Sequence, residues 1–254
     1  MTAAGMFPHG ALAASSPASG LDDEFAKRAV QGTFAHLDVT TDRLTLVNEH
    51  RAQKRYIPAS TFKIPNSLFA LETGIVTGPD EVFKWDGKPA AMKEWERDMT
   101  FSEAIRVSNV PIYQRIARRV GLKNYEVWLD RLGYGNANPG TVVDRFWLDG
   151  PLAISAIEQT SFLAALALQE LPMSKTAQSA VKGMLLQETR DGRSLYAKTG
   201  WLSAGQIGWW VGWVEGNGRI DSFALNMDVP SEADLPKRKE VGLAMLARLG
   251  IYPA

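Results

Sequence analysis

The sequence predicts an α+β fold, in which helices cover an antiparallel sheet of five or more strands and an all-helical lobe is inserted mid-chain. Two β-rich runs stand near the N-terminus, helical patterns fill the middle, and three β-rich runs precede a last helix. Strands at both ends of a chain, with helices between them, are typical of one sheet interrupted by an insertion. We expect an active site where the sheet edge meets this lobe.

The first predicted elements are two strands and a helix. Residues 31–39 and 43–48 are rich in β-forming side chains and are separated by a short polar turn, which predicts a hairpin. Residues 60–73 predict a helix that ends at Gly74, with Pro65 in the first turn, where a missing N–H costs little.

The rest of the chain is predicted to be helical first and then β-rich. Helices are expected at 101–120, with an interruption near Pro111, and at 123–132, 156–170, 174–187 and 236–249. The pattern in 156–170 predicts a strongly amphipathic helix. Strands are expected at 194–201, 207–215 and 219–227, joined by short loops that contain Gly or Asn.

The chain length of 254 residues suits one domain, which we place at 26–254 with the helical lobe at about 76–190. Residues 1–25 are expected to be a flexible tail or the remnant of an export signal. They begin with small, uncharged residues but lack the basic start and long apolar run of a complete signal. No run of about 18 apolar residues occurs, so no membrane span is expected.

The composition excludes several classes of function. The 28 basic and 28 acidic residues give zero formal charge, so a nucleic-acid partner is not expected. The absence of cysteine excludes thiol nucleophiles, disulfides and cysteine zinc sites. No two of the three histidines have the spacing of metal ligands, so no metal site is expected.

Ser60 and Lys63, in the stretch PASTFKIP, are the first candidates for catalysis. A spacing of three residues places both side chains on one face of a helix. A serine hydroxyl needs a base within hydrogen-bond reach, and lysine serves as that base only where apolar surroundings remove its charge. The pattern S-x-x-K alone is weak, and we interpret its second copy, Ser179 to Lys182, as chance because it lies mid-helix.

Further motifs strengthen the case. The tripeptide KTG at 198–200 places an ammonium, a hydroxyl and a glycine on a predicted edge strand, a combination that can hold an anionic carbonyl compound. Ser108, in S-N-V, stands at a break between helices and can point into a cleft or serve as a local cap. The YGN stretch beginning at Tyr134 is a turn by itself.

Taken in order, these motifs resemble the class D, oxacillinase-type serine β-lactamases. S-x-x-K, S-D-N and K-T-G mark serine β-lactamases and penicillin-binding proteins, and S-N-V replaces the middle motif here. The stretches FWLDGPLAIS and LPKRKEV are also similar to that family, and the resemblance covers roughly residues 30–250. It implies the serine β-lactamase/penicillin-binding protein fold and hydrolysis of β-lactam antibiotics, including oxacillin-type penicillins.

The resemblance assigns four catalytic residues. Ser60 would open the β-lactam ring and become acylated, and Ser108 would relay a proton to the leaving nitrogen. Lys63 would be the base, carboxylated by CO2 to N6-carboxylysine, and would act on Ser60 and then on water. Trp147 would donate its indole N–H to that carbamate, with a purely structural role as the alternative. No cofactor beyond CO2 or bicarbonate is implied.

The resemblance also assigns substrate contacts. Val110 and Leu148 would line the pocket, and Tyr134 would shape it or assist proton transfer. Lys198, Thr199 and Arg238 would bind the substrate carboxylate. The oxyanion hole would consist of the backbone N–H groups of Ser60 and Trp201. The remaining residue of this set is Gly200, which permits close approach to the strand.

Several rival functions remain at this stage. A β-lactam sensor domain would share fold and motifs but stay acylated, and would be joined to membrane helices. A peptidoglycan transpeptidase or carboxypeptidase also shares S-x-x-K and K-T-G. A Ser-His-Asp hydrolase is disfavoured because G-x-S-x-G does not occur, and a non-enzymatic binding module would leave the motifs unexplained. The family implies a periplasmic protein with a small-molecule β-lactam as substrate, while the neutral charge and aromatic content permit either a monomer or a homodimer.

Overall fold

The computed structural model describes residues 13–17, 20–202 and 206–253, which share one seven-stranded sheet of order β1-β3-β2-β9-β8-β7-β6. All neighbouring strands pair antiparallel except β1 and β3, which are parallel. The strands are β1 (Ala13–Pro17), β2 (Gly32–Asp38), β3 (Arg43–Val47), β6 (Leu186–Arg190), β7 (Arg193–Leu202), β8 (Ile207–Gly216) and β9 (Arg219–Asp228). The predicted α+β fold with an antiparallel sheet of five or more strands is confirmed.

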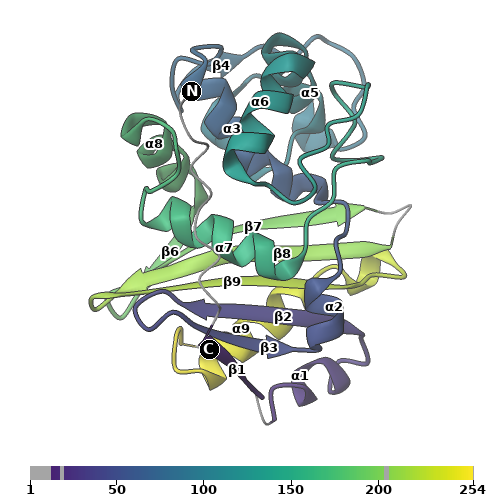
Figure 1. Ribbon diagram of the computed structural model, residues 1–254. Coiled ribbons are helices and arrows are strands. Elements are labelled where there is room, and N and C mark those ends of the chain that lie inside the picture. Colours follow the sequence, from purple (N-terminus) through teal and green to yellow (C-terminus); the bar gives the residue numbers. More distant parts are fainter. Residues whose placement is uncertain (1–12, 18–19, 203–205, 254) are drawn as a thin grey trace.

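Helices cover both faces of this sheet and build a lobe above it (Figure 1). The lobe contains α3, α5 and α6, together with the short strands β4 and β5. The helices are α1 (Asp23–Ala26), α2 (Glu49–Gln53), α3 (Lys63–Glu72), α4 (Phe101–Arg106), α5 (Val110–Val120), α6 (Leu122–Leu132), α7 (Ala156–Ala167), α8 (Lys175–Leu185) and α9 (Lys237–Arg248). The short pieces are β4 (Val82–Phe83), β5 (Met99–Thr100) and the 3₁₀ turns η1 (Ala59–Phe62), η2 (Lys93–Trp95) and η3 (Glu232–Asp234).

The strand β8 shows how the sheet separates two hydrophobic cores. Successive side chains of a strand point to opposite faces, so Trp209 and Trp213 pack into the core beneath the helical lobe. Trp210 and Val214 pack on the other face, against α1 and α9. Because both faces are covered, β8 is buried without the polar alternation of a half-exposed strand.

Two sequence-based expectations need correction. The helix predicted at 156–170 ends at Ala167 and is not strongly amphipathic, because α7 lies between the sheet and the lobe and is buried on most of its sides. The helix predicted at 174–187 ends at Leu185, and the chain continues as the edge strand β6. Most side chains of β6 are exposed, so the sequence carries no alternating pattern that would mark a strand.

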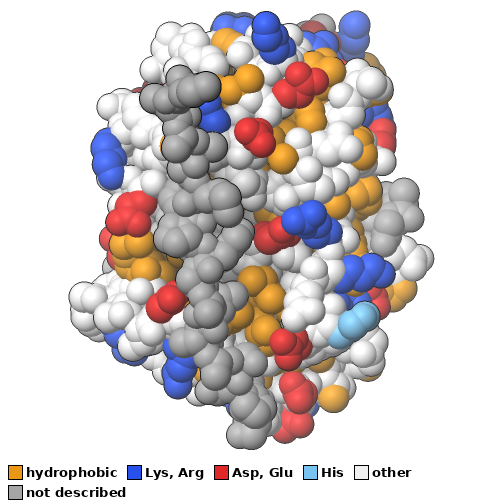
Figure 2. All heavy atoms as spheres, in the orientation of Figure 1, with side chains coloured by type: hydrophobic (Ala, Val, Ile, Leu, Met, Phe, Trp, Pro, Cys, Tyr) orange, Lys and Arg blue, Asp and Glu red, His pale blue; other side chains and the backbone are white. Residues whose placement is uncertain are grey.

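Other boundaries agree with the sequence. The expected break near Pro111 lies between α4 and α5, and Pro111 occupies the first turn of α5. The flexible tail expected at 1–25 needs correction in its described part, because residues 13–17 form β1 beside β3 and Asp23 begins α1; residues 1–12 and 18–19 lie outside the described residues. Across the face shown in Figure 2, basic and acidic side chains are interspersed, in keeping with the zero formal charge.

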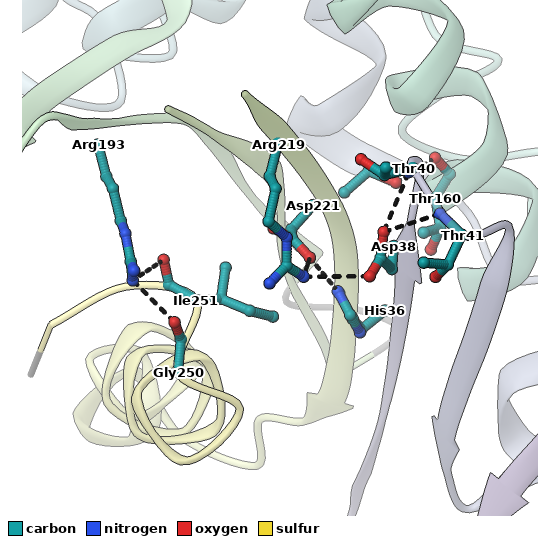
Figure 3. Close-up of polar contacts among 11 residues, drawn as sticks. His36, Asp38, Thr40, Thr41, Thr160, Arg193, Arg219, Asp221, Gly250 and Ile251 are labelled. Atoms are coloured by element: carbon teal, nitrogen blue, oxygen red, sulfur yellow. Dashed lines mark hydrogen bonds and ion pairs between the residues drawn. The ribbon is translucent and has the colours of Figure 1, made fainter. Parts of the chain in front are cut away.

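A buried polar cluster joins β2 and β9 at one end of the sheet (Figure 3). Asp38 and Asp221 are direct cross-strand partners, an arrangement that would be repulsive without compensation. Arg219 donates from one guanidinium nitrogen to both carboxylates at 3.1 Å, and His36 Nε2 lies 2.9 Å from Asp221 Oδ1. The backbone N–H of Thr40 also donates to Asp38 at 3.0 Å. Every carboxylate of the cluster therefore has charged or hydrogen-bonded partners.

Candidate active site

Ser60 lies in η1, immediately before α3 and against the strands β7 and β8. Its neighbour Ala59 has a φ of +50°, a left-handed conformation that costs energy for any residue with a Cβ atom. The turn is held by Thr61, whose hydroxyl donates to Pro58 O at 2.7 Å and accepts from Gln159 at 2.9 Å. The side chain of Ser60 remains half-buried, so a small molecule can reach it.

The ammonium group of Lys63 lies 2.8 Å from Ser60 Oγ. Lys63 is only 1% exposed, and burial lowers its pKa from the usual 10.5 to about 7. Its nitrogen also lies 5.3 Å from the ring centroid of Tyr113. A substantial fraction of Lys63 is therefore neutral near pH 7, and a neutral amine at this distance can accept the proton of Ser60.

A second serine–lysine contact faces the first. Ser108 connects α4 to α5 with a φ of +56°, and Lys198 on β7 donates to its Oγ. Lys198 also donates to Thr199 O at 2.9 Å and is 6% exposed. Its pKa is well below the usual value because of burial and, next, the positive charge of Lys63. The fold thus assembles residues that are 90 positions apart in the chain.

Arg238, in the first turn of α9, completes a group of basic side chains. It donates to Gly200 O at 2.6 Å and to Leu235 O at 2.8 Å, and burial lowers its pKa to about 10. Within the described ranges, neither it nor the two lysines Lys63 and Lys198 has an acidic partner. Buried cations without counter-ions favour the binding of an anion.

Two glycines allow this arrangement. A Cβ atom on Gly200 would lie 3.0 Å from Pro58 O, so glycine permits the close approach of β7 to η1. A Cβ atom on Gly208, on β8, would lie 2.7 Å from Cδ of Arg238. The sequence analysis did not single out Gly208, although a glycine inside a strand is the signal that could have indicated such an approach.

Trp147 contributes a buried donor without an acceptor. Its ring stacks on Phe62 with centroids 5.5 Å apart, and the side chain is fully buried. Its indole N–H has no hydrogen-bond partner among the residues described, and the same holds for Trp201. Buried donors are rarely left unpaired, so an acceptor supplied by substrate or modification would fit here.

The remaining predicted contacts differ in their surroundings. Val110 begins α5 and Leu148 packs at the margin of the main core, and both are half-buried. Tyr134 is fully buried, edge-on to Phe62 at 5.9 Å and to Phe162 at 5.2 Å. Burial raises the pKa of Tyr134. This position supports the pocket-shaping role of Tyr134 rather than proton transfer.

The second S-x-x-K copy makes no serine–lysine contact. Ser179 accepts a hydrogen bond from Gln169 at 2.8 Å, and Lys182 forms an ion pair with Glu215. Lys182 also lies 5.5 Å from the ring centroid of Tyr196. Both side chains therefore have structural partners, in contrast to Ser60 and Lys63.

Neither a metal cluster nor a membrane helix is found in the described part of the chain. No three His, Asp or Glu side chains gather there in a way that could hold a metal ion. Of the helices described, none combines the length and the apolar character needed to cross a bilayer.

Comparison with known families defines the class of protein. Residues 12–247 match the family described as "Penicillin binding protein transpeptidase domain". β-Lactamase OXA-5 of Pseudomonas aeruginosa is 45% identical over 233 residues, which are 90% of this chain and 87% of that protein. β-Lactamase OXA-48 of Klebsiella pneumoniae is 42% identical over 208 residues, which are 81% of this chain and 78% of that protein.

Solved structures narrow this class. FUS-1 (OXA-85), a class D β-lactamase from Fusobacterium nucleatum subsp. polymorphum, matches with a TM-score of 0.90 and 37% identity, over 93% of this chain and 99% of that chain. The class D β-lactamase YbXI from Nostoc matches with a TM-score of 0.89 and 36% identity, over 91% of this chain and 99% of that chain. The chain belongs to the class D β-lactamases, and the resemblance inferred from its motifs is confirmed.

Proposed function

We propose that this protein hydrolyses β-lactam antibiotics, including oxacillin-type penicillins, through an acyl-enzyme on Ser60. The observation that carries the proposal is the contact between Ser60 Oγ and Lys63 Nζ at 2.8 Å, with the lysine buried and its pKa lowered to about 7. A hydroxyl and a neutral amine in this geometry form an activated nucleophile. Membership of the class D β-lactamases supports the choice of substrate.

Acylation begins with transfer of the Ser60 proton to its base. Ser60 Oγ forms a bond to the lactam carbonyl carbon, the carbon–nitrogen bond of the ring breaks, and the nitrogen leaves with a proton. Ser108 would relay that proton, and the hydrogen bond that it accepts from Lys198 supports this role. The backbone N–H groups of Ser60 and Trp201 would stabilise the oxyanion, and removing one such donor costs about 10²–10³ in rate.

Deacylation requires a base that activates water, and Lys63 is the group available. Its neutral form is the one that reacts with CO2, and the unpaired indole N–H of Trp147 would donate to the resulting carbamate. Carboxylation would supply an oxygen base that serves both the acylation and the deacylation half-reactions. We therefore propose that bicarbonate or CO2 is needed for full activity.

The substrate carboxylate would be held by Lys198, Thr199 and Arg238. The three side chains belong to the edge of β7 and the start of α9, and no acidic partner competes for the two cations within the described residues. We further propose that the enzyme acts in the bacterial periplasm, where β-lactams meet their cell-wall targets, as a monomer or homodimer. The relatives named above come from bacteria.

Steady-state hydrolysis of a chromogenic cephalosporin and of oxacillin, each with and without added bicarbonate, tests this function. We expect continued turnover of both and higher rates with bicarbonate. Ser60→Ala should abolish turnover and the drug adduct seen by mass spectrometry, whereas the matched control Ser179→Ala should retain both. A single burst that ends at one acyl group per protein would instead indicate a sensor.

A further inference from the structure

A cavity of about 60 Å³ lies at the edge of β7, beyond the point where β6 stops pairing with it. Lys198 and Thr199 line it from β7, Arg106 from the end of α4, and Lys239 from α9. A single water needs about 10–15 Å³, so the cavity has room for a few waters or one small oxyanion. It is a site for a charged substituent rather than for a whole drug.

Basic side chains dominate this cavity. Arg106 and Lys239 are exposed and form no ion pair or side-chain hydrogen bond with any residue the structure describes. No acidic residue lines the cavity. The acids closest to them in sequence are held elsewhere: Glu103 lies 3.1 Å from Arg97, and Glu240 lies 3.8 Å from Arg28. The positive potential of the cavity is therefore uncompensated.

The cavity adjoins the proposed carboxylate site. Arg106 stands two residues before Ser108, Lys239 follows Arg238 directly, and Lys198 lines both sites. The charge of Lys239 also contributes to the lowered pKa of Lys198, after burial and the charges of Lys63 and Arg238. An anion held by Lys198 and Arg238 thus has a second basic region next to it.

The chemistry of cephalosporins fits this geometry. The carbon that carries the variable ring substituent is bonded to the carbon that carries the ring carboxylate. When that carboxylate is anchored at Lys198 and Arg238, the substituent lies within a few bonds of the anchor. We propose that Arg106 and Lys239 form an outer anion subsite, which binds an acidic group on this substituent and favours dianionic cephalosporins. This inference rests on the proposed hydrolysis of β-lactams.

The test compares two cephalosporins that differ only in an acidic or a neutral ring substituent. In the variant Arg106→Gln/Lys239→Gln, kcat/KM for the acidic substrate should fall about tenfold, because two partly screened charges are lost. kcat/KM for the neutral substrate should stay within about twofold of the wild-type value. The preference of the wild-type protein for the acidic substrate should weaken with added salt.

A control variant, Lys123→Gln/Arg131→Gln on α6, removes the same net charge away from the cavity and should change neither substrate. Equal losses for both substrates in the Arg106/Lys239 variant, or no loss for either, would overturn the outer subsite while hydrolysis itself stands. Failure of the wild-type protein to hydrolyse either substrate would instead refute the proposed function.

Discussion

Two buried polar clusters of this protein differ in whether their charged groups have partners of opposite charge. In the cluster around Asp38 and Asp221, Arg219 and His36 provide partners for the carboxylates (Figure 3). In the active site, Lys63 and Lys198 are equally buried, but their partners are hydroxyl and carbonyl oxygens. A buried charge without a counter-charge is unfavourable for folding, so its presence in a cleft indicates function.

The pKa shifts of the buried groups also differ between the two clusters. Burial alone would raise the pKa of Asp38, but hydrogen bonds from Thr41 and Thr40 and the charge of Arg219 leave it lowered, so the charged form is favoured. Burial lowers the pKa of Lys63 to about 7, which favours its neutral form, and it also lowers the pKa of Lys198, whose charged form a bound anion would restore. One cluster holds charges in place, and the other prepares an amine to take up a proton.

Removing the unpaired lysine should have the largest effect. We expect Lys63→Met to lower kcat/KM by about 10⁴-fold, because general-base catalysis contributes up to that much. The free energy of unfolding should not fall, because an apolar side chain of similar shape replaces a buried amine. Lys182→Met, in the second S-x-x-K copy, should retain activity. A Lys63→Met variant that keeps turnover, or that unfolds more easily, would contradict the comparison.

Removing a carboxylate from the cluster around Asp38 and Asp221 should instead lower stability and leave activity unchanged. Asp221→Asn removes the carboxylate that pairs with His36, while Arg219 keeps its contact with Asp38, and it should lower the free energy of unfolding by about 1–3 kcal/mol. kcat of the folded variant should be unchanged. Asp228→Asn on the same strand loses a pair with Arg51 in which the carboxylate is exposed, and it should cost about 1 kcal/mol or less. Urea unfolding of both variants beside the wild type checks this, and equal losses would refute the assignment.

The pH dependence of stability should distinguish the wild type from Lys63→Met in CO2-free buffer. The folded pKa of Lys63 is about 7 and the usual value is 10.5, so between these values the unfolded chain binds more protons than the folded one. Stability must therefore rise with pH across this window, by at most about 1.4 kcal/mol per pH unit for one group. Below the window both states bind the proton and the full cost of burial is present.

The variant lacks this contribution. Denaturant unfolding of the two proteins between about pH 7 and pH 10.5 should show that the free energy of unfolding rises more with pH in the wild type than in Lys63→Met. Parallel stability curves would show that Lys63 is not held in its neutral form.

Arg238→Gln should give the smallest effect of the series. It removes an unpaired cation at the proposed carboxylate site, and kcat/KM should fall about tenfold for a β-lactam with a free carboxylate. The methyl ester of the same β-lactam carries no charge there, so the wild type and the variant should hydrolyse it equally. A loss that is equal for acid and ester would assign Arg238 a structural role.

Short-range patterns allowed much of the fold and site to be predicted. The spacing of Ser60 and Lys63 placed them on one face, and the structure shows them in contact. The hairpin of β2 and β3 and the three consecutive strands β7, β8 and β9 followed from their composition and turns. These features depend on neighbours in the chain, which a single sequence displays directly.

Features that depend on tertiary pairing were not predictable in this way. The contact between Ser108 and Lys198 was not predicted: the family resemblance assigned the two residues separate roles, and no local pattern links a position between two helices to one on a strand. The His36–Asp221 pair depends on the register of β2 against β9, and the burial of α7 depends on what lies on both of its sides. The edge strand β6 was missed because its side chains are mostly exposed.

The most direct test of the account is the titration of Lys63 itself. NMR of protein labelled at the lysine ε-carbon, in CO2-free buffer, would follow its ionisation, with Lys63→Met used to assign the signal. The account predicts a midpoint near the lowered pKa of about 7. A midpoint near the usual value of 10.5 would contradict it, because Lys63 would then be charged at neutral pH and unable to accept the proton of Ser60.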